Sequence, residues 1–238
     1  MGNLNRSNQF VEKFHSLCAR HPRFTVWNDF IHIIAYTISN GCNYRQDRED
    51  KYLDIVKRYS KDELNKIAEL FALTVVALEE NRHQDFLGQL YMDIGFGDTR
   101  KGQYFTSYDI ALLISQLTDN DRSGNEKYVT VNDPACGSGV MLIAYANELI
   151  RSGVILHTGL FVVANDIDPC IALMCYIQLS LLGCAGYVCI RNTLTEPVTG
   201  DVYHPPEDAF LTPLFFHPVW QTRRLFNMSS RRKHSECS

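Results

Sequence analysis

Between residues 128 and 190, short apolar runs alternate with segments long enough to be helices, and no other feature constrains the fold as strongly. The runs at 128–131, 160–164 and 187–190 have the length and composition of buried strands. The segments at 141–150 and 170–182 are predicted to be the helices between them. Strands that alternate with helices of this length indicate βαβ units and a parallel sheet, so we expect an α/β domain.

Ahead of this domain, residues 8–95 carry a helical pattern. The segment Ser60-Lys61-Asp62-Glu63 is a capping box, in which Ser60 and Glu63 satisfy each other's free backbone N–H groups. Two stripes of large apolar residues recur at helical spacing and are predicted to face the core rather than a ligand: Trp27, Phe30, Ile31, Ile34 and Ile38, and then Leu64, Ile67, Leu70, Phe71 and Leu78.

We predict three parts along the chain: a helical region at 1–98, an α/β domain at 99–220 and a basic tail at 221–238. Five of the eight prolines lie between Pro197 and Pro218, which indicates an irregular segment there. We expect the tail beyond it to be flexible.

The net charge of −4 is unevenly distributed. Residues 101–220 hold 5 basic and 12 acidic groups, whereas residues 221–238 hold 5 basic groups and 1 acidic group. A protein that binds a nucleic-acid duplex alone usually has a broad basic face, and this chain has only a short basic tail. We therefore expect any duplex to be contacted mainly through another chain.

Hydrophobic residues make up 45% of the chain and charged residues 21%, which is the balance of a globular protein. No apolar run is long enough to cross a bilayer, and Met1–Phe10 lacks the apolar stretch of a signal peptide. We expect a cytoplasmic protein without a membrane partner. The eight cysteines form no C-x-x-C pair, so we expect buried, reduced thiols and no metal site.

The segment Asp133-Pro134-Ala135-Cys136-Gly137-Ser138-Gly139 follows a predicted strand and opens a predicted helix. Glycines at such a turn let a ligand approach the backbone, and the helix N-terminus behind them offers free N–H groups. A plain strand-to-helix turn is the alternative interpretation. We favour a nucleoside site, because the acid and the glycines stand together where such a ligand needs them.

Two shorter segments add to this site. Asn165-Asp166-Ile167-Asp168-Pro169 ends the second predicted strand, where Asp166 can accept hydrogen bonds from both hydroxyls of a ribose. The alternative interpretation of this segment is a helix cap, formed by Asp168. The segment Gly102-Gln103-Tyr104-Phe105-Thr106 precedes a second predicted capping box, Thr106 to Asp109, and by itself it indicates only a well-capped helix.

In this order, and followed by Asn192-Thr193-Leu194, these segments resemble the motifs of adenine-N6 DNA methyltransferases. The likeness is greatest to the modification subunits of type I restriction systems and their relatives on mobile elements. It covers residues 8–195 and implies a Rossmann-like sheet that binds S-adenosylmethionine (SAM), behind a helical N-terminal region. The resemblance predicts a chain truncated after its SAM-binding motifs, so that the sheet is incomplete.

The resemblance also implies a role for each matching residue. Tyr104, Phe105 and Thr106 would contact the methionine end of SAM, and Asp166 would hold its ribose, with Ile167 against the adenine ring. Asn192 would reach the adenine amino group. The remaining cofactor residues would line the amino-acid and ribose portions: Asp133, Ala135, Gly137 and Gly139.

The chain departs from the family at the catalytic tetrapeptide, Asn/Asp-Pro-Pro-Tyr/Phe, which is missing. The nearest match is His204-Pro205-Pro206-Glu207, only a dozen positions past Asn192. His204, Pro205 and Pro206 are therefore the candidate catalytic residues, in a degenerate motif.

Two functions remain open at this point. The first is a site-specific DNA adenine-N6 methyltransferase of restriction-modification or mobile-element type, which reaches DNA through another subunit or a specificity protein. The alternative is a catalytically degenerate methyltransferase that acts as an accessory or regulatory subunit. Methylation of protein glutamine or of a small molecule gains no support, because the glutamine enzymes also need an Asn-Pro-Pro-Tyr.

Overall fold

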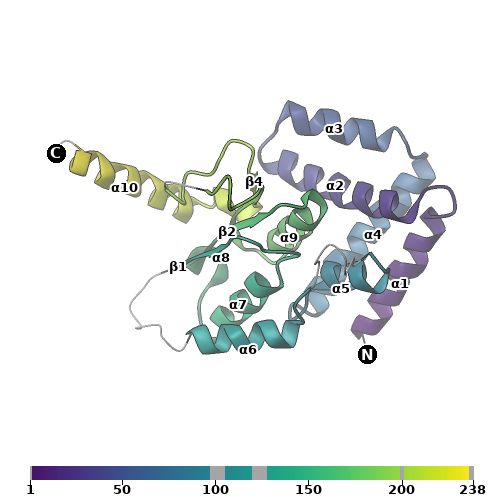
Figure 1. Cartoon of the computed structure of the whole chain (residues 1–238), viewed down its shortest axis with the longest axis horizontal. Coiled ribbons are helices and arrows are strands. Elements are labelled where there is room, and N and C mark those ends of the chain that lie inside the picture. Colours follow the sequence, from purple (N-terminus) through teal and green to yellow (C-terminus); the bar gives the residue numbers. More distant parts are fainter. Residues whose placement is uncertain (1, 97–104, 120–127, 199–200, 236–238) are drawn as a thin grey trace.

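The computed structural model describes residues 2–96, 105–119, 128–198 and 201–235 (Figure 1). Six helices precede the first strand: α1 (Gly2–Leu17), α2 (Arg23–Cys42), α3 (Gln46–Val56), α4 (Lys61–Glu80), α5 (Phe86–Asp93) and α6 (Tyr108–Asp119). The elements that follow are β1 (Val129–Asp133), α7 (Val140–Arg151), α8 (Leu156–Gly159), β2 (Leu160–Asp166), α9 (Pro169–Leu181), β3 (Ala185–Ile190), β4 (Phe210–Leu211), the 3-10 helix η2 (Pro213–Phe216) and α10 (Pro218–Ser235).

The helical N-terminal region forms as its sequence pattern predicts. Ser60 caps α4 by accepting from the N–H of Glu63, and the Glu63 carboxylate accepts from the N–H of Ser60, which confirms the capping box. Trp27, Phe30 and Ile31 are fully buried in the main hydrophobic core. This region packs on the sheet domain through α2, which lies along α9 (Figure 1).

The sheet has four strands in the order β1-β2-β3-β4. The first three are parallel, with Asp133 opposite Ala164 and Asp166 opposite Ile190, while β4 runs antiparallel to β3. The predicted βαβ units are therefore confirmed. Strands β1 and β2 run two residues further than predicted, which brings Asp133 and Asp166 to the carboxyl ends of neighbouring strands.

The two faces of the sheet are covered differently. On β2, Val162 faces the main core with α7 and α9, whereas its neighbour Phe161 faces a second, smaller core. The second core is closed by Tyr203, Phe215 and Trp220 from the C-terminal segment, and the rings of Tyr203 and Trp220 each lie 5.0 Å from that of Phe161. Segment 201–220 thus covers the face of the sheet that α7 and α9 leave open.

Helix α10 differs from the expected flexible tail, because residues 218–235 are helical. Arg223 stacks over the rings of Tyr128 and Trp220, at 4.0 and 4.3 Å, and donates to the carbonyl of Thr158. Arg224 stacks over Phe215 and donates to its carbonyl. Packing against the sheet domain therefore orders the first turns of the basic segment.

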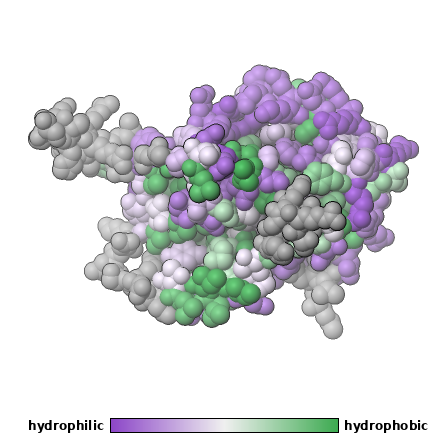
Figure 2. Space-filling model, in the orientation of Figure 1, coloured by the Kyte–Doolittle hydropathy of each residue, from purple (hydrophilic) through white to green (hydrophobic). Residues whose placement is uncertain are grey.

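Helix α6 packs against α7 and leaves an apolar stripe on its outer side. Four residues at helical spacing are between 42% and 65% exposed: Ile110, Leu113, Ile114 and Leu117. Figure 2 shows this hydrophobic surface over α6. The helix begins at Tyr108, one residue later than a cap at Thr106 requires. In the described ranges, no helix is long and apolar enough to cross a membrane.

Candidate functional site

The loop at 133–139 is held by its own backbone and by β2. The Asp133 carboxylate accepts from the N–H of Ala135 at 3.1 Å, and the N–H of Cys136 donates to the carbonyl of Asn165 at 2.8 Å. The N–H of Gly139 turns back to the carbonyl of Cys136 at 2.9 Å. These hydrogen bonds within the protein therefore fix the loop to the end of β2.

Two glycines of this loop have positive φ angles, +56° at Gly137 and +99° at Gly139. A side chain at Gly139 would meet Cys175 Sγ at 2.8 Å, so this glycine lets the loop pack tightly on α9. At Gly137 the nearest atom is Phe105 Cε1, 3.9 Å from where a Cβ would stand. A Cβ at Gly137 would thus make an ordinary van der Waals contact, so the positive φ rather than crowding accounts for this glycine.

The two aspartates after β2 have separate roles. Asp166 accepts from the N–H of Gly137 and from the N–H of Asp168, each at 2.9 Å. Asp168 is the N-cap of α9 and accepts from the N–H groups of Cys170 and Ile171. The cap predicted at Asp168 is confirmed, and Asp166 remains at the strand end with acceptor capacity to spare.

The segment after β3 reaches the same loop. The hydroxyl of Thr193 donates to the carbonyl of Pro134 at 2.7 Å, and the Asn192 side chain accepts from the N–H of Leu194 at 3.0 Å. The N–H of Arg191 donates to the carbonyl of Asp166. Residues from the ends of all three parallel strands therefore meet at one edge of the sheet, as their positions in the sequence predict.

The candidate residues also differ in exposure. Ile167 is 66% exposed beside Asp166, so an aromatic ligand can reach its side chain. Phe105 is partly buried, with its ring 5.7 Å from Tyr91, and Thr106 is exposed. Tyr104 lies outside the described residues.

Burial raises the pKa of Asp133, and the nearby Asp166 carboxylate raises it further. The hydrogen bond from the N–H of Ala135 opposes this shift. The two acids are thus close enough to repel each other, and a positively charged or hydrogen-bond-donating ligand would relieve that repulsion.

The segment His204-Pro205-Pro206-Glu207 follows Tyr203, whose hydroxyl forms a hydrogen bond with that of Thr130 in β1 at 3.1 Å, and it precedes β4. Strand β4 pairs with β3, and Asp208 forms an ion pair with Arg191 at 2.6 Å. His204 pairs with Asp201, Nδ1 to Oδ2 at 3.2 Å. The segment therefore connects the second core, on one face of the sheet, to the edge strand β4, whereas the cofactor candidates lie at the carboxyl ends of β1, β2 and β3.

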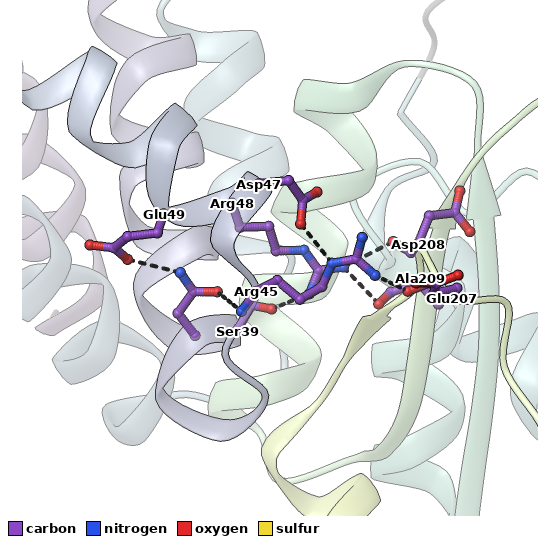
Figure 3. Close-up of polar contacts among 9 residues, drawn as sticks. Ser39, Arg45, Asp47, Arg48, Glu49, Glu207, Asp208 and Ala209 are labelled. Atoms are coloured by element: carbon purple, nitrogen blue, oxygen red, sulfur yellow. Dashed lines mark hydrogen bonds and ion pairs between the residues drawn. The ribbon is translucent and has the colours of Figure 1, made fainter.

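Two arginines of α3 and its N-cap hold this segment, as Figure 3 shows. Arg45 donates to the carbonyl of Glu207, and buried Arg48 donates to the carbonyls of Asp208 and Ala209 at 2.9 and 2.8 Å. The sequence pattern contained no signal for these contacts, because the partners are about 160 positions apart and meet only through tertiary packing.

The described part of the chain contains no cluster of three or more histidine, cysteine or acidic side chains that could hold a metal ion. Seven cysteines are free thiols there, five of them buried.

Parallel strands joined by helices, with a glycine loop after β1 and an acid at the end of β2, define a Rossmann-like α/β fold. The family described as N-6 DNA Methylase matches residues 84–233, and the chain belongs to that family. Among solved structures, the chain is similar to a protein described as a class I S-adenosylmethionine-dependent methyltransferase from Listeria monocytogenes. The identity is 14% and the TM-score 0.40, over 74% of this chain and 56% of that one. No curated protein matches the chain.

Proposed function

We propose that this protein binds SAM where the carboxyl ends of β1, β2 and β3 meet. Asp166 would accept hydrogen bonds from the ribose hydroxyls, Ile167 would pack against the adenine ring and Asn192 would reach its amino group. Phe105 and Thr106, with Tyr104, would contact the methionine end. The amino-acid and ribose portions would lie along the loop, on Asp133, Ala135, Gly137 and Gly139.

The observation that carries this proposal is the hydrogen bond between the Gly137 N–H and Asp166 Oδ2. It joins the glycine loop to the acid on the neighbouring strand. A carboxylate has about four acceptor sites, and two are used by Gly137 and Asp168, so two remain for a ligand with paired hydroxyls.

We further propose that the natural reaction is methyl transfer to adenine N6 in DNA, within a restriction-modification or mobile-element system. Family membership supports this substrate class. His204, Pro205 and Pro206 are the candidates for the target side of the site. DNA would be reached through another subunit, since Arg223 and Arg224 are already engaged by the protein itself.

The second candidate is a SAM-binding accessory or regulatory subunit without activity of its own. Two observations favour it. Arg45 and Arg48 bind the carbonyls of residues 207–209, directly after His204-Pro205-Pro206, and among the described residues β1 pairs with β2 alone. The strand edge next to the glycine loop therefore lacks a target-binding strand in the described part of the chain.

Two measurements on the purified chain test these proposals. Calorimetry with SAM tests the site, and saturable binding is expected; no binding by the folded protein would overturn it. Transfer of tritium from methyl-labelled SAM to mixed DNA then separates the two functions. Transfer by the chain, alone or together with candidate partner subunits, supports the enzyme, whereas SAM binding without transfer under both conditions supports the accessory subunit.

A further inference from the structure

A buried polar cluster lies directly beneath the glycine loop. Its members are Asp85, which caps α5, Ser138 from the loop itself and Gln178 from α9. Each is no more than 3% exposed. None belongs to the SAM site proposed above, yet Ser138 stands between the two glycines of that site.

Each polar atom of the cluster has a partner. The Ser138 hydroxyl and Asp85 Oδ2 form a hydrogen bond. The Gln178 amide donates to Asp85 Oδ1 at 2.8 Å and to the Ser138 carbonyl at 2.9 Å, and its oxygen accepts from the N–H of Leu87 at 3.1 Å. Ser138 is thus held at both its side chain and its backbone.

The cluster also leaves no spare room. The N–H of Gly88 donates to Asp85 Oδ1 at 2.9 Å, and a Cβ at Gly88 would lie 2.5 Å from Ser138 Oγ. Buried polar groups that are fully paired and closely packed have one stable arrangement. The backbone position of Ser138, and with it the orientation of Gly137 and Gly139, therefore depends on Asp85.

We propose that Asp85 is a positioning residue for the SAM-binding loop, acting through Ser138 and Gln178. This rests on the proposed function. Asp85 belongs to the helical region that precedes the sheet domain, so the helical region would contribute to cofactor affinity without touching the cofactor. Burial raises the pKa of Asp85, and the three hydrogen bonds oppose that shift.

The test measures SAM and adenosine binding by calorimetry for the full chain and its variants. Asp85→Ala removes the carboxylate that accepts hydrogen bonds from Gly88, Ser138 and Gln178. We expect the affinity for SAM to fall at least tenfold. Asp85→Asn keeps the shape and one acceptor oxygen, and we expect affinity to return to within about threefold of wild type. Adenosine keeps the ribose but lacks the amino-acid portion that would lie along the loop, so its affinity is expected to fall less than that of SAM.

Ser138→Ala is the second variant, in case Asp85→Ala does not fold. It removes one buried hydroxyl, and its matched control is Thr74→Val, which removes a buried hydroxyl that donates to Leu70 in α4. Weaker SAM binding by Ser138→Ala but not by Thr74→Val supports the proposal. In the Asp85→Ala background, Ser138→Ala should cause no further loss.

The proposal is overturned if Asp85→Ala, or Ser138→Ala where Asp85→Ala does not fold, binds SAM like wild type. It is equally overturned if SAM and adenosine weaken by the same factor, because a general structural defect would do that. Failure of the wild type to bind SAM would instead overturn the proposed function, so the two failures are distinguishable.

Discussion

The N–H of Gly137 donates to the carboxylate of Asp166 at 2.9 Å, across the carboxyl ends of two neighbouring parallel strands. The residues are 29 positions apart in the chain. Their contact is possible because a helix between the strands returns the chain to the same edge of the sheet. The contact brings a glycine-containing turn and a carboxylate acceptor into one site.

The first prediction concerns the acceptor. Asp166→Ala is expected to weaken SAM binding by roughly 1–3 kcal/mol, because the ribose hydroxyls would lose their acceptor in a partly buried site. Calorimetry measures the change. Asp168→Ala is the matched control: it removes the same charge two residues away, from the side chain that caps α9. Equal losses in both variants would contradict the assignment of Asp166.

The second prediction contrasts the two glycines of the loop. Gly139→Ala should destabilise the fold by roughly 1–3 kcal/mol, because its φ is +99° and the added carbon would meet Cys175. Gly137→Ala should cost about 1–2 kcal/mol of strain and should also block SAM. Urea unfolding and calorimetry separate the two effects. Adding Cys175→Ala to Gly139→Ala should restore part of the lost stability, and no restoration would count against this contact.

The third prediction concerns pH. Burial raises the folded-state pKa of Asp85 above its unfolded value, which is about 3.9. The stability that the protonated carboxyl contributes is therefore fully present below pH 4 and is lost as pH rises through the folded pKa. Asp85→Asn cannot ionise, so its free energy of unfolding relative to wild type should increase between pH 4 and 7. A difference that is constant over this range, measured by urea unfolding, would contradict the shift.

The fourth prediction concerns the basic segment. Arg223→Ala should lower stability by about 1–2 kcal/mol, because the guanidinium stacks on Tyr128 and Trp220 in a partly buried position. It should change DNA binding little. Replacing Arg231, Arg232 and Lys233 together should instead abolish any weak DNA binding, which should fall steeply with salt. Tight, site-specific binding by the isolated chain at physiological salt, in a mobility-shift assay, would refute this prediction.

The fifth prediction is that the chain alone transfers methyl groups to adenine very poorly. The adenine amino group is a weak nucleophile, and family members orient it with an Asn or Asp oxygen while the flipped base stacks on an aromatic ring. A neutral His204 offers one acceptor nitrogen for the amino group. Glu207 has no aromatic ring on which the base could stack, so roughly 1–3 kcal/mol of stacking energy per base would be lost. Arg45 and Arg48 also bind the backbone carbonyls of residues 207–209.

A tritium-transfer assay on adenine-containing DNA checks the fifth prediction, with and without candidate partner subunits. Wild type is compared with the double variant His204→Asn/Glu207→Tyr. A gain by the double variant would support the segment as the target side of the site. Robust adenine methylation by the wild-type chain alone would show that the missing tetrapeptide is not required.

The parallel strands, the helices between them and the capping box at Ser60 were all predictable, because each depends on the pattern of a short stretch of sequence. The meeting of Gly137, Asp166 and Thr193 was predictable as well. The ends of consecutive parallel strands lie at one edge of a sheet whatever packs around it. The arrangement of the proposed SAM site is thus a consequence of local patterns and one general rule of topology.

Contacts between distant segments could not be predicted, because they depend on which surfaces pack together. Asp85 meets Ser138, and Arg48 meets Ala209, only because the helical region docks on α9 and the chain after β3 returns along the sheet. The order in α10 has the same origin, since Arg223 stacks on Tyr128, which adjoins β1. The sequence alone determined the strands, the helices and the cofactor loop. Only the tertiary structure decided what supports that loop and where His204 lies, because side-chain packing over large separations leaves no periodic trace in a sequence.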